Sequence, residues 1–313
     1  MIRHYQSGDE AAIVALWNRA CPSDPITMDL FTKRVLIDAN FDAEGLILFE
    51  EAGDLLGFTL AIVRRLPLSG SDLEPDDGWI TAFFVDPTRR RNGISHEMFK
   101  AAETFFRARS RRRVYFSSYA PNYFMPGVDP DRYAHGKQFL ERRGFRTLYS
   151  PVAMDRHLVD YQVPQDVIDL EETRRQEGYV FEPLSPRYIT QVVEFNDTQF
   201  NPDWARAVRE AINRGVPLHQ IFIARHADQV VGFCMYGGYD GVQERFGPFG
   251  VDDSKRGTGL GKILLYKCLT QMKASGLHTA WFLWTGEESP AGHLYFRAGF
   301  QVTRRFDVMQ LNL

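Results

Sequence analysis

Residues 251–261 read V-D-D-S-K-R-G-T-G-L-G and join a strand-like apolar run to an amphipathic helical run. A glycine-rich turn that opens a helix leaves backbone N–H groups without partners, and the helix dipole adds partial positive charge there. Such a turn can bind phosphate or pyrophosphate. A weaker copy, V-D-P-T-R-R-R-N-G-I-S, spans residues 85–95 in the same setting. Two copies indicate a duplicated domain that binds a phosphorylated cofactor.

Length and composition favour an ordinary globular protein with two domains. The chain has 313 residues, of which 44% are hydrophobic and 25% are charged. A net charge of -3 argues against a surface built for nucleic acid. No apolar run reaches the roughly 18 residues that suggest a membrane span, and the N-terminus has no apolar signal core. The three scattered cysteines favour reduced thiols in the cytoplasm and no metal site. We therefore expect a cytoplasmic protein without membrane or nucleic-acid partners.

Both halves show the same order of predicted elements. The sequence of the first half predicts one helix over 9–20, a second that begins at 93 and a third that ends at 143. It also predicts strands over 46–49, 55–63, 79–85, 114–118 and 145–154. The second half predicts helices over 185–195, 203–215, from 260, and over 289–298, with strands over 220–224, 230–236, 246–251, 279–284 and 300–313. This α/β pattern predicts an N-terminal domain over 1–158, a linker with a short solvated helix over 159–178, and a C-terminal domain over 179–313.

Two motifs resemble the GNAT superfamily of acyl-CoA-dependent N-acyltransferases. The first is a strand ending in valine followed by R-G-T-G-L-G at residues 256–261, and the second is A-G-H-L-Y-F-R-A-G-F at residues 291–300. The first half offers R-R-N-G-I-S at 90–95 and F-L-E-R-R-G-F at 139–145. The resemblance implies two tandem GNAT-like domains, each a mixed, mostly antiparallel sheet (α+β) flanked by helices. Three residues depart from the family pattern, namely Ser95, Leu140 and Glu288.

Other nucleotide motifs fit this turn poorly. A P-loop requires a glycine where Arg256 stands and a serine or threonine where Ile263 stands. A dinucleotide fingerprint requires G-x-G-x-x-G, whereas the glycine spacing here is G-x-G-x-G. A glycine-rich helix start that serves only tight packing remains the alternative to a binding site.

The resemblance implies that acetyl-CoA binds the second half. The turn amides would hold the pyrophosphate, helped by Arg256 and Lys262, and the end of the preceding strand would contact the pantetheine arm while the strand from Thr279 diverges. The cofactor-binding residues predicted in this way are Phe249, Gly250, Val251, Arg256, Gly257, Thr258, Gly259, Leu260, Gly261 and Lys262. The secondary set in the first half is Val85, Arg90, Arg91, Asn92, Gly93, Ile94 and Ser95.

Two catalytic residues are predicted. The resemblance makes Tyr295 the general acid that returns a proton to the leaving thiolate, whereas spacing alone favours a packing role. Glu244 lies shortly before the strand that ends at Val251, where bases of the family often lie. The alternatives for the base are Glu287, Glu288 and a bound water, and Glu244 could also be an exposed strand-end carboxylate.

These observations predict an N-acetyltransferase that transfers an acetyl group from acetyl-CoA to a primary amine of a small molecule. The second half would be catalytic, because Ser95 and Leu140 weaken the motifs of the first. A non-catalytic acyl-CoA-binding or scaffolding protein is the alternative, and a longer acyl donor stays open. The basic run 107–113 favours a solvated helix end over a nucleic-acid patch. The aromatic loop 119–131 could line an acceptor pocket or cover an interface between the halves.

Overall fold

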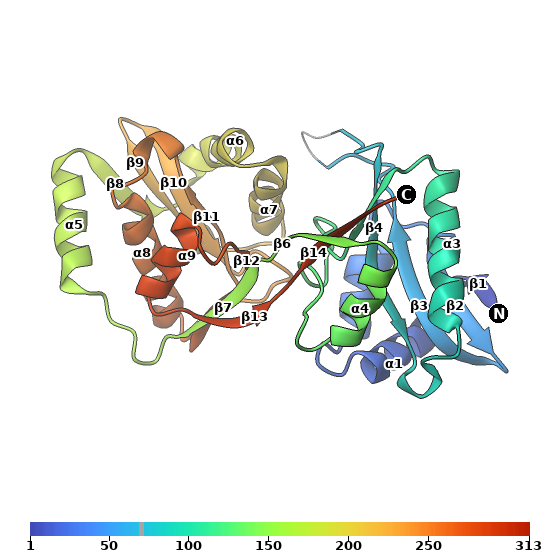
Figure 1. Ribbon diagram of the computed structural model, residues 1–313. Coiled ribbons are helices and arrows are strands. Elements are labelled where there is room, and N and C mark those ends of the chain that lie inside the picture. The colour runs from blue at the N-terminus through green and yellow to red at the C-terminus, as the bar shows by residue number, and fades with distance from the viewer. Residues whose placement is uncertain (69–71) are drawn as a thin grey trace. The chain divides into compact units, whose positions relative to one another are not determined.

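The computed structural model describes residues 1–68 and 72–313, which form two compact units (Figure 1). The first unit comprises Met1–Pro151 and Arg305–Leu313, and the second comprises Val152–Arg304. The predicted linker over 159–178 lies within the second unit, and Arg305–Leu313 belongs to the first because Val308–Asn312 pairs with strands of that unit. Among the described residues, no helix has the length and apolar character that a bilayer crossing requires.

The first unit is built on a mixed seven-stranded sheet in the order β1-β2-β3-β4-β5-β14-β6. Its strands are β1 (Ile2–His4), β2 (Leu46–Glu51), β3 (Asp54–Ile62), β4 (Asp77–Val85), β5 (Arg113–Phe116), β6 (Arg146–Tyr149) and β14 (Val308–Asn312). Its helical elements are α1 (Glu10–Ala20), α2 (Met28–Phe31), the π-helical turn η1 (Thr32–Leu36), the 3-10 turn η2 (Pro87–Arg89), α3 (Ile94–Ala108) and α4 (Ala134–Arg142). β4 and β5 are parallel and the other pairs are antiparallel, as the family resemblance predicted.

The second unit has a four-stranded sheet, β11-β10-β9-β8, and a three-stranded sheet, β12-β7-β13. The strands are β7 (Val152–His157), β8 (Tyr179–Pro183), β9 (Ile221–His226), β10 (Gln229–Tyr236), β11 (Phe246–Val251), β12 (Thr279–Thr285) and β13 (Gln301–Arg305). The helical elements are α5 (Gln165–Gln176), η3 (Pro186–Tyr188), α6 (Ile189–Gln199), α7 (Pro202–Asn213), η4 (Leu218–Gln220), η5 (Asp253–Lys255), α8 (Leu260–Ala274) and α9 (Pro290–Arg297).

The alternation of side chains along β9 separates the two cores of the second unit. Ile221 and Ile223 belong to the cluster that α6 and α7 cover, whereas Phe222 and Ala224 belong to the cluster beneath α8. Successive strand residues point to opposite faces of a sheet, so one apolar strand serves both clusters. Residues of β11, α8 and α9, which form the candidate site, belong to the cluster beneath α8.

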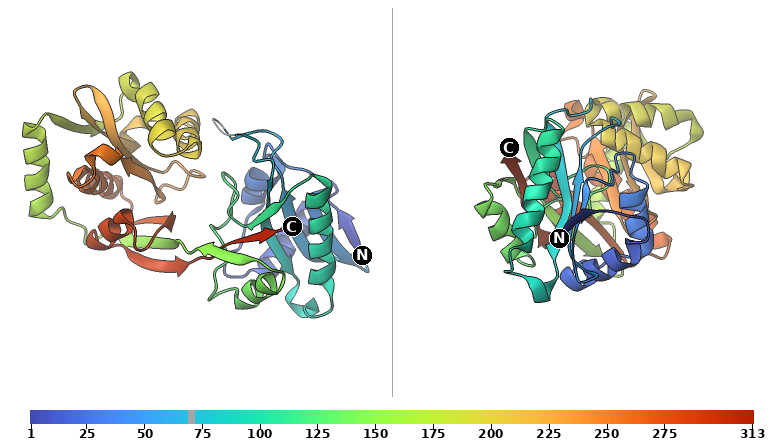
Figure 2. Two further views of the ribbon diagram at one scale, coloured as in Figure 1. Left: turned by 45° about the horizontal axis from the view of Figure 1, so that its top comes forward. Right: turned by 90° about the vertical axis from the view of Figure 1, so that its right-hand side faces the viewer.

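The predicted strands over 145–154 and 300–313 each break into two strands that lie in different sheets. β14 lies between β5 and β6 in the first unit, and β7 lies between β12 and β13 in the second (Figure 2). The predictions of single strands were therefore wrong. A local apolar pattern does not specify which distant strand is the partner, so the exchange could not be predicted from that pattern.

Candidate functional site

The glycine turn between β11 and α8 has the backbone of an anion-binding helix start. The Asp252 side chain accepts a hydrogen bond from the Ser254 N–H at 2.8 Å and fixes the chain as it leaves β11. Gly257 and Gly259 then adopt left-handed φ angles of +79° and +84°. Glycine adopts this conformation without the steric cost that a Cβ imposes. Both positions of the turn thus favour glycine.

The start of α8 presents unpaired backbone donors. The Ile263 N–H donates to the Gly259 carbonyl at 3.1 Å, which is the first bond of the helix. Within residues 1–68 and 72–313, no group accepts a hydrogen bond from the N–H of Gly259, Leu260, Gly261 or Lys262. Four free donors at the positive end of a 15-residue helix suit a phosphate or pyrophosphate.

β11 is the end strand of its sheet and exposes backbone groups. The Asp252 N–H donates to the Val231 carbonyl at 2.9 Å, and Gly250 lies opposite Phe233. Because hydrogen-bonded residues alternate in an antiparallel pair, the backbone groups of Phe249 and Val251 point away from β10. A β-bulge precedes them, between the residue pairs at Phe246 and Phe249.

β12 contacts only the entry of β11 and then diverges into the other sheet. The Trp281 N–H donates to the Glu244 carbonyl at 3.0 Å, and Arg245 and Trp281 form an isolated parallel bridge. Along its length, from Thr279 to Thr285, β12 pairs with β7. The divergence expected after Thr279 is thus observed, and it leaves the Phe249–Val251 edge free for an extended ligand.

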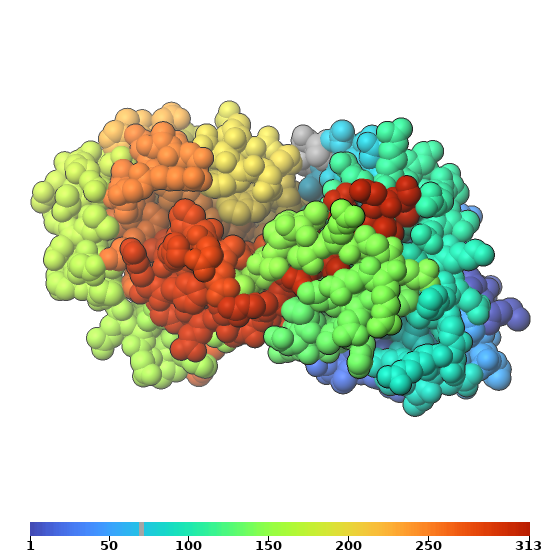
Figure 3. All heavy atoms as spheres, in the orientation of Figure 1, coloured from blue at the N-terminus to red at the C-terminus, as the bar shows by residue number. Residues whose placement is uncertain are grey.

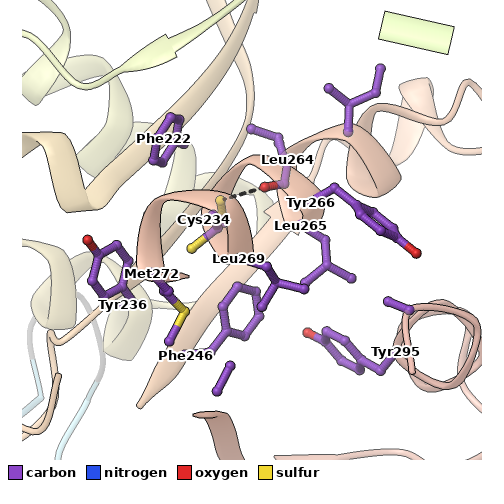
Figure 4. Close-up of a cluster of buried hydrophobic side chains, with 14 of the residues drawn as sticks. Phe222, Cys234, Tyr236, Phe246, Leu264, Leu265, Tyr266, Leu269, Met272 and Tyr295 are labelled. Atoms are coloured by element: carbon purple, nitrogen blue, oxygen red, sulfur yellow. Dashed lines mark hydrogen bonds between the residues drawn. The ribbon is translucent and has the colours of Figure 1, made fainter. Parts of the chain in front are cut away.

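Tyr295 extends from α9 into the buried cluster beneath α8 (Figure 4). The side chain is 6% exposed, and its ring centroid lies 4.5 Å from that of Phe282 and 6.0 Å from that of Phe249. Burial raises the pKa of the phenol well above its usual value. No described group forms a hydrogen bond with its hydroxyl. The hydroxyl is therefore protonated at neutral pH and free to donate.

Glu244 is half-buried at the entry of β11, where that strand touches β12. No described cation or donor pairs with its carboxylate. The neighbouring Arg245 is 5% exposed, lies 3.3 Å from the Asp240 carboxylate and stacks over the Tyr239 ring at 4.3 Å. These contacts hold the strand entry and leave the Glu244 carboxylate available to accept a proton. Sequence reasoning missed Arg245, since nothing in its local pattern marks a buried arginine.

The two cations predicted to assist the turn already have carboxylate partners. Arg256 pairs with Asp253, and Lys262 pairs with Asp166 of α5. The hydrogen bond from Lys262 is the main cause that lowers the pKa of Asp166. An incoming phosphate would have to compete with both carboxylates. At this turn the backbone N–H groups of Gly259–Lys262, unlike the two cationic side chains, have no described partner.

The first unit reproduces the backbone of this turn with different side chains. Asp86 caps η2 with φ -47° and ψ 128°, against -48° and 129° for Asp252. Gly93 has a φ of +82°, and Arg91 is forced to +67°. The other residues of the predicted secondary set flank these two. Val85 is the last residue of β4, and Arg90 donates a hydrogen bond to the Ala20 carbonyl at 3.3 Å. Asn92 is exposed, Ile94 is buried and Ser95 is half-buried.

Aromatic packing fills the first unit near this turn. Phe83 of β4 stacks on Phe139 of α4, with centroids 5.4 Å apart and planes at 13°. Leu140, which stands where the second unit has Tyr295, is 2% exposed and carries no proton to donate. The first unit thus has the turn and carries leucine in place of the tyrosine.

Both halves of the chain match family models of known proteins. Residues 12–125 match the Acetyltransferase (GNAT) family model, and residues 217–302 match the Acetyltransferase (GNAT) domain model. A search of curated proteins gave no match.

Solved structures share the fold across the whole chain. A GCN5-related glucosamine N-acetyltransferase region of a fungal multi-domain β-N-acetylglucosaminidase superimposes with a TM-score of 0.82 at 17% identity, covering 99% of this chain and 38% of that longer one. A GCN5-related N-acetyltransferase from Sphaerobacter thermophilus gives 0.72 at 16% identity, covering 100% and 95%. A tandem GNAT protein from the clavulanic acid biosynthesis pathway gives 0.65 at 15% identity, covering 100% and 98%.

Proposed function

Because the chain belongs to the GNAT family of acyltransferases, we propose that its second unit transfers an acetyl group from acetyl-CoA to a primary amine of a small molecule. The observation that carries the proposal is the junction of β11 and α8. There the four free N–H groups of the helix start adjoin the unpaired backbone edge of Phe249 and Val251. A pyrophosphate joined to an extended amide-bearing arm matches this arrangement.

The turn fits the close approach of a phosphate. A Cβ built on Gly259 would lie 2.6 Å from a methyl carbon of Leu170, so a side chain here would require Leu170 to move. A Cβ on Gly257 would meet no atom within 4 Å, so the chain is open on that side. One face of the turn is closed by protein and the other is open to a ligand.

In the proposed reaction the amine nitrogen attacks the thioester carbonyl carbon, a C–N bond forms and the C–S bond breaks. The Glu244 carboxylate accepts the proton that the amine loses, directly or through water. An N–H from the Phe249–Val251 edge stabilises the oxyanion. The Tyr295 hydroxyl donates its proton to the leaving thiolate, and burial of that hydroxyl keeps it protonated until it is needed.

Thiol release tests this proposal. Acetyl-CoA is incubated with a panel of primary amines that includes glucosamine, because the similar fungal region is named for that acceptor. We expect amine-dependent release of free CoA by the wild type and a fall in kcat of about 100-fold in Tyr295→Phe. Tyr236→Phe is the matched control, since Tyr236 is buried in the same cluster and its hydroxyl contacts Ser275 at 3.1 Å. Tight binding of acetyl-CoA without turnover of any amine would instead identify a non-catalytic acyl-CoA-binding protein.

A further inference from the structure

The segment predicted as a linker contains a helix, α5, that packs beside the glycine turn. α5 lies along α8 at the surface of the second unit (Figures 1 and 3). Val167 is 2% exposed in the cluster beneath α8, and Glu171 pairs with Lys267 of α8 at 2.8 Å. The preceding Tyr161 donates its hydroxyl to the Tyr266 carbonyl at 2.6 Å. These contacts give α5 a fixed place against the start of α8.

One arginine of α5 bonds to the backbone of the turn. The Arg174 Nε donates to the Thr258 carbonyl at 2.8 Å, and its Nη1 is held by the Glu177 carboxylate at 2.7 Å. In a trans peptide the C=O and the following N–H point in opposite directions. By fixing the Thr258 carbonyl toward α5, Arg174 directs the Gly259 N–H away from α5, toward the open side of the turn.

Leu170 closes the same side of the turn. Its methyl carbon would lie 2.6 Å from a Cβ on Gly259, so the helix packs directly on that glycine. Arg174 and Leu170 lie four residues apart and therefore share one face of α5. The turn is thus supported by one hydrogen bond and one apolar contact from the same helical face.

The corresponding turn of the first unit lacks this support. Asn92 stands in the place of Thr258, and no described group donates a hydrogen bond to its carbonyl. The His96 N–H donates to the Gly93 carbonyl at 2.9 Å, whereas the corresponding Lys262 N–H has no described acceptor. The turn of the second unit therefore has one more backbone N–H without a described acceptor than the turn of the first unit.

We propose that Arg174 is a positioning residue for the donor pyrophosphate, which makes α5 part of the acyl-CoA site. It holds the Thr258–Gly259 peptide so that the Gly259 N–H faces the phosphate oxygens. The inference rests on the proposed function, because it assumes that the turn binds the pyrophosphate of an acyl-CoA.

Two acyl donors, compared as substrates, distinguish this positioning role from general support of the fold. Acetyl-CoA carries the pyrophosphate, and S-acetyl-pantetheine carries the same thioester and arm without it. We expect Arg174→Ala to weaken CoA binding in calorimetry and to raise the KM for acetyl-CoA, each about ten-fold, with kcat unchanged. The kcat/KM for S-acetyl-pantetheine stays at the wild-type value. Arg174→Lys, which keeps a donor, recovers most of the affinity.

Arg175→Ala is the matched control, because Arg175 is on the same helix and bonds to Glu171 instead of the turn. It should leave CoA affinity unchanged. An unchanged affinity in Arg174→Ala would overturn the proposal, as would an equal loss of kcat/KM with both donors. A wild-type protein that binds no CoA would overturn the proposed function and this inference with it. Wild-type binding that survives Arg174→Ala would overturn the inference alone.

Discussion

Arg91 and Gly257 occupy the same place in two turns of matching backbone, with φ angles of +67° and +79°. A left-handed φ costs a residue with a Cβ about 1–2 kcal/mol, and glycine is nearly free of that cost. The first unit has the shape of this turn without the residue type that suits it. The shape is therefore maintained by its surroundings, among them the Asp86 cap and Gly93.

Arg91→Gly should stabilise the first unit. Removing the left-handed strain outweighs the extra chain entropy of glycine, so we expect a gain of about 0.5–1 kcal/mol in the free energy of unfolding. Chemical denaturation measures this change. Arg90→Gly is the control, because Arg90 has an ordinary φ of -64° and should lose stability when replaced. Equal effects of the two substitutions would show that the left-handed φ carries no cost.

Aspartate at the glycines of the second turn should abolish CoA binding. A carboxylate there would occupy and repel the pyrophosphate site, and calorimetry with CoA measures the loss. Gly257→Asp is cleaner than Gly259→Asp, since a Cβ on Gly257 meets no atom within 4 Å. In the first unit Gly93, with a φ of +82°, corresponds to Gly259, and Gly93→Asp is the comparison because a Cβ on Gly93 also meets no atom within 4 Å. We expect it to affect turnover less. Loss of activity in Gly93→Asp alone would mean that the roles of the two units are reversed.

The raised pKa of Tyr295 predicts the shape of the pH profile. A general acid must be protonated, and burial moves its deprotonation to a pH above the usual value near 10. With both substrates saturating, kcat should therefore show no alkaline decline from this group up to about pH 9.5. A decline with an apparent pKa between about 8 and 9 that disappears in Tyr295→Phe would contradict the assignment.

Asp166→Asn should tighten CoA binding. The substitution releases Lys262 from its ion pair, so that its ammonium can approach a phosphate. We expect an affinity gain of about three-fold at low ionic strength that shrinks as salt is added. Asp169→Asn is the control, because Asp169 bonds to Gln165 on the same helix and not to a cation of the turn. A loss of affinity in Asp166→Asn would show that this ion pair supports the turn.

The duplicated fold could be predicted because its markers are local. The turn at residues 256–261 and the helix that carries Tyr295 each occupy a short stretch with its own glycine and apolar spacing. Both elements are observed where the sequence placed them, and the family and fold are confirmed. The roles of Tyr295 and Glu244 remain predictions.

The features that could not be predicted depend on distant partners. The exchange of β7 and β14 joins strands far apart in the chain, and local periodicity does not encode that choice. The charged pattern of α5 indicated a solvated helix and concealed the face with Val167, Leu170 and Arg174. The pairing of Lys262 with Asp166 likewise spans nearly a hundred residues.

A crystal structure with CoA would show directly where the cofactor binds. We predict pyrophosphate oxygens on the N–H groups of Gly259–Lys262, the pantetheine arm along Phe249–Val251, and the sulfur within about 3.5 Å of the Tyr295 hydroxyl. CoA bound only at the turn of residues 90–95, or a thiol remote from Tyr295, would contradict it.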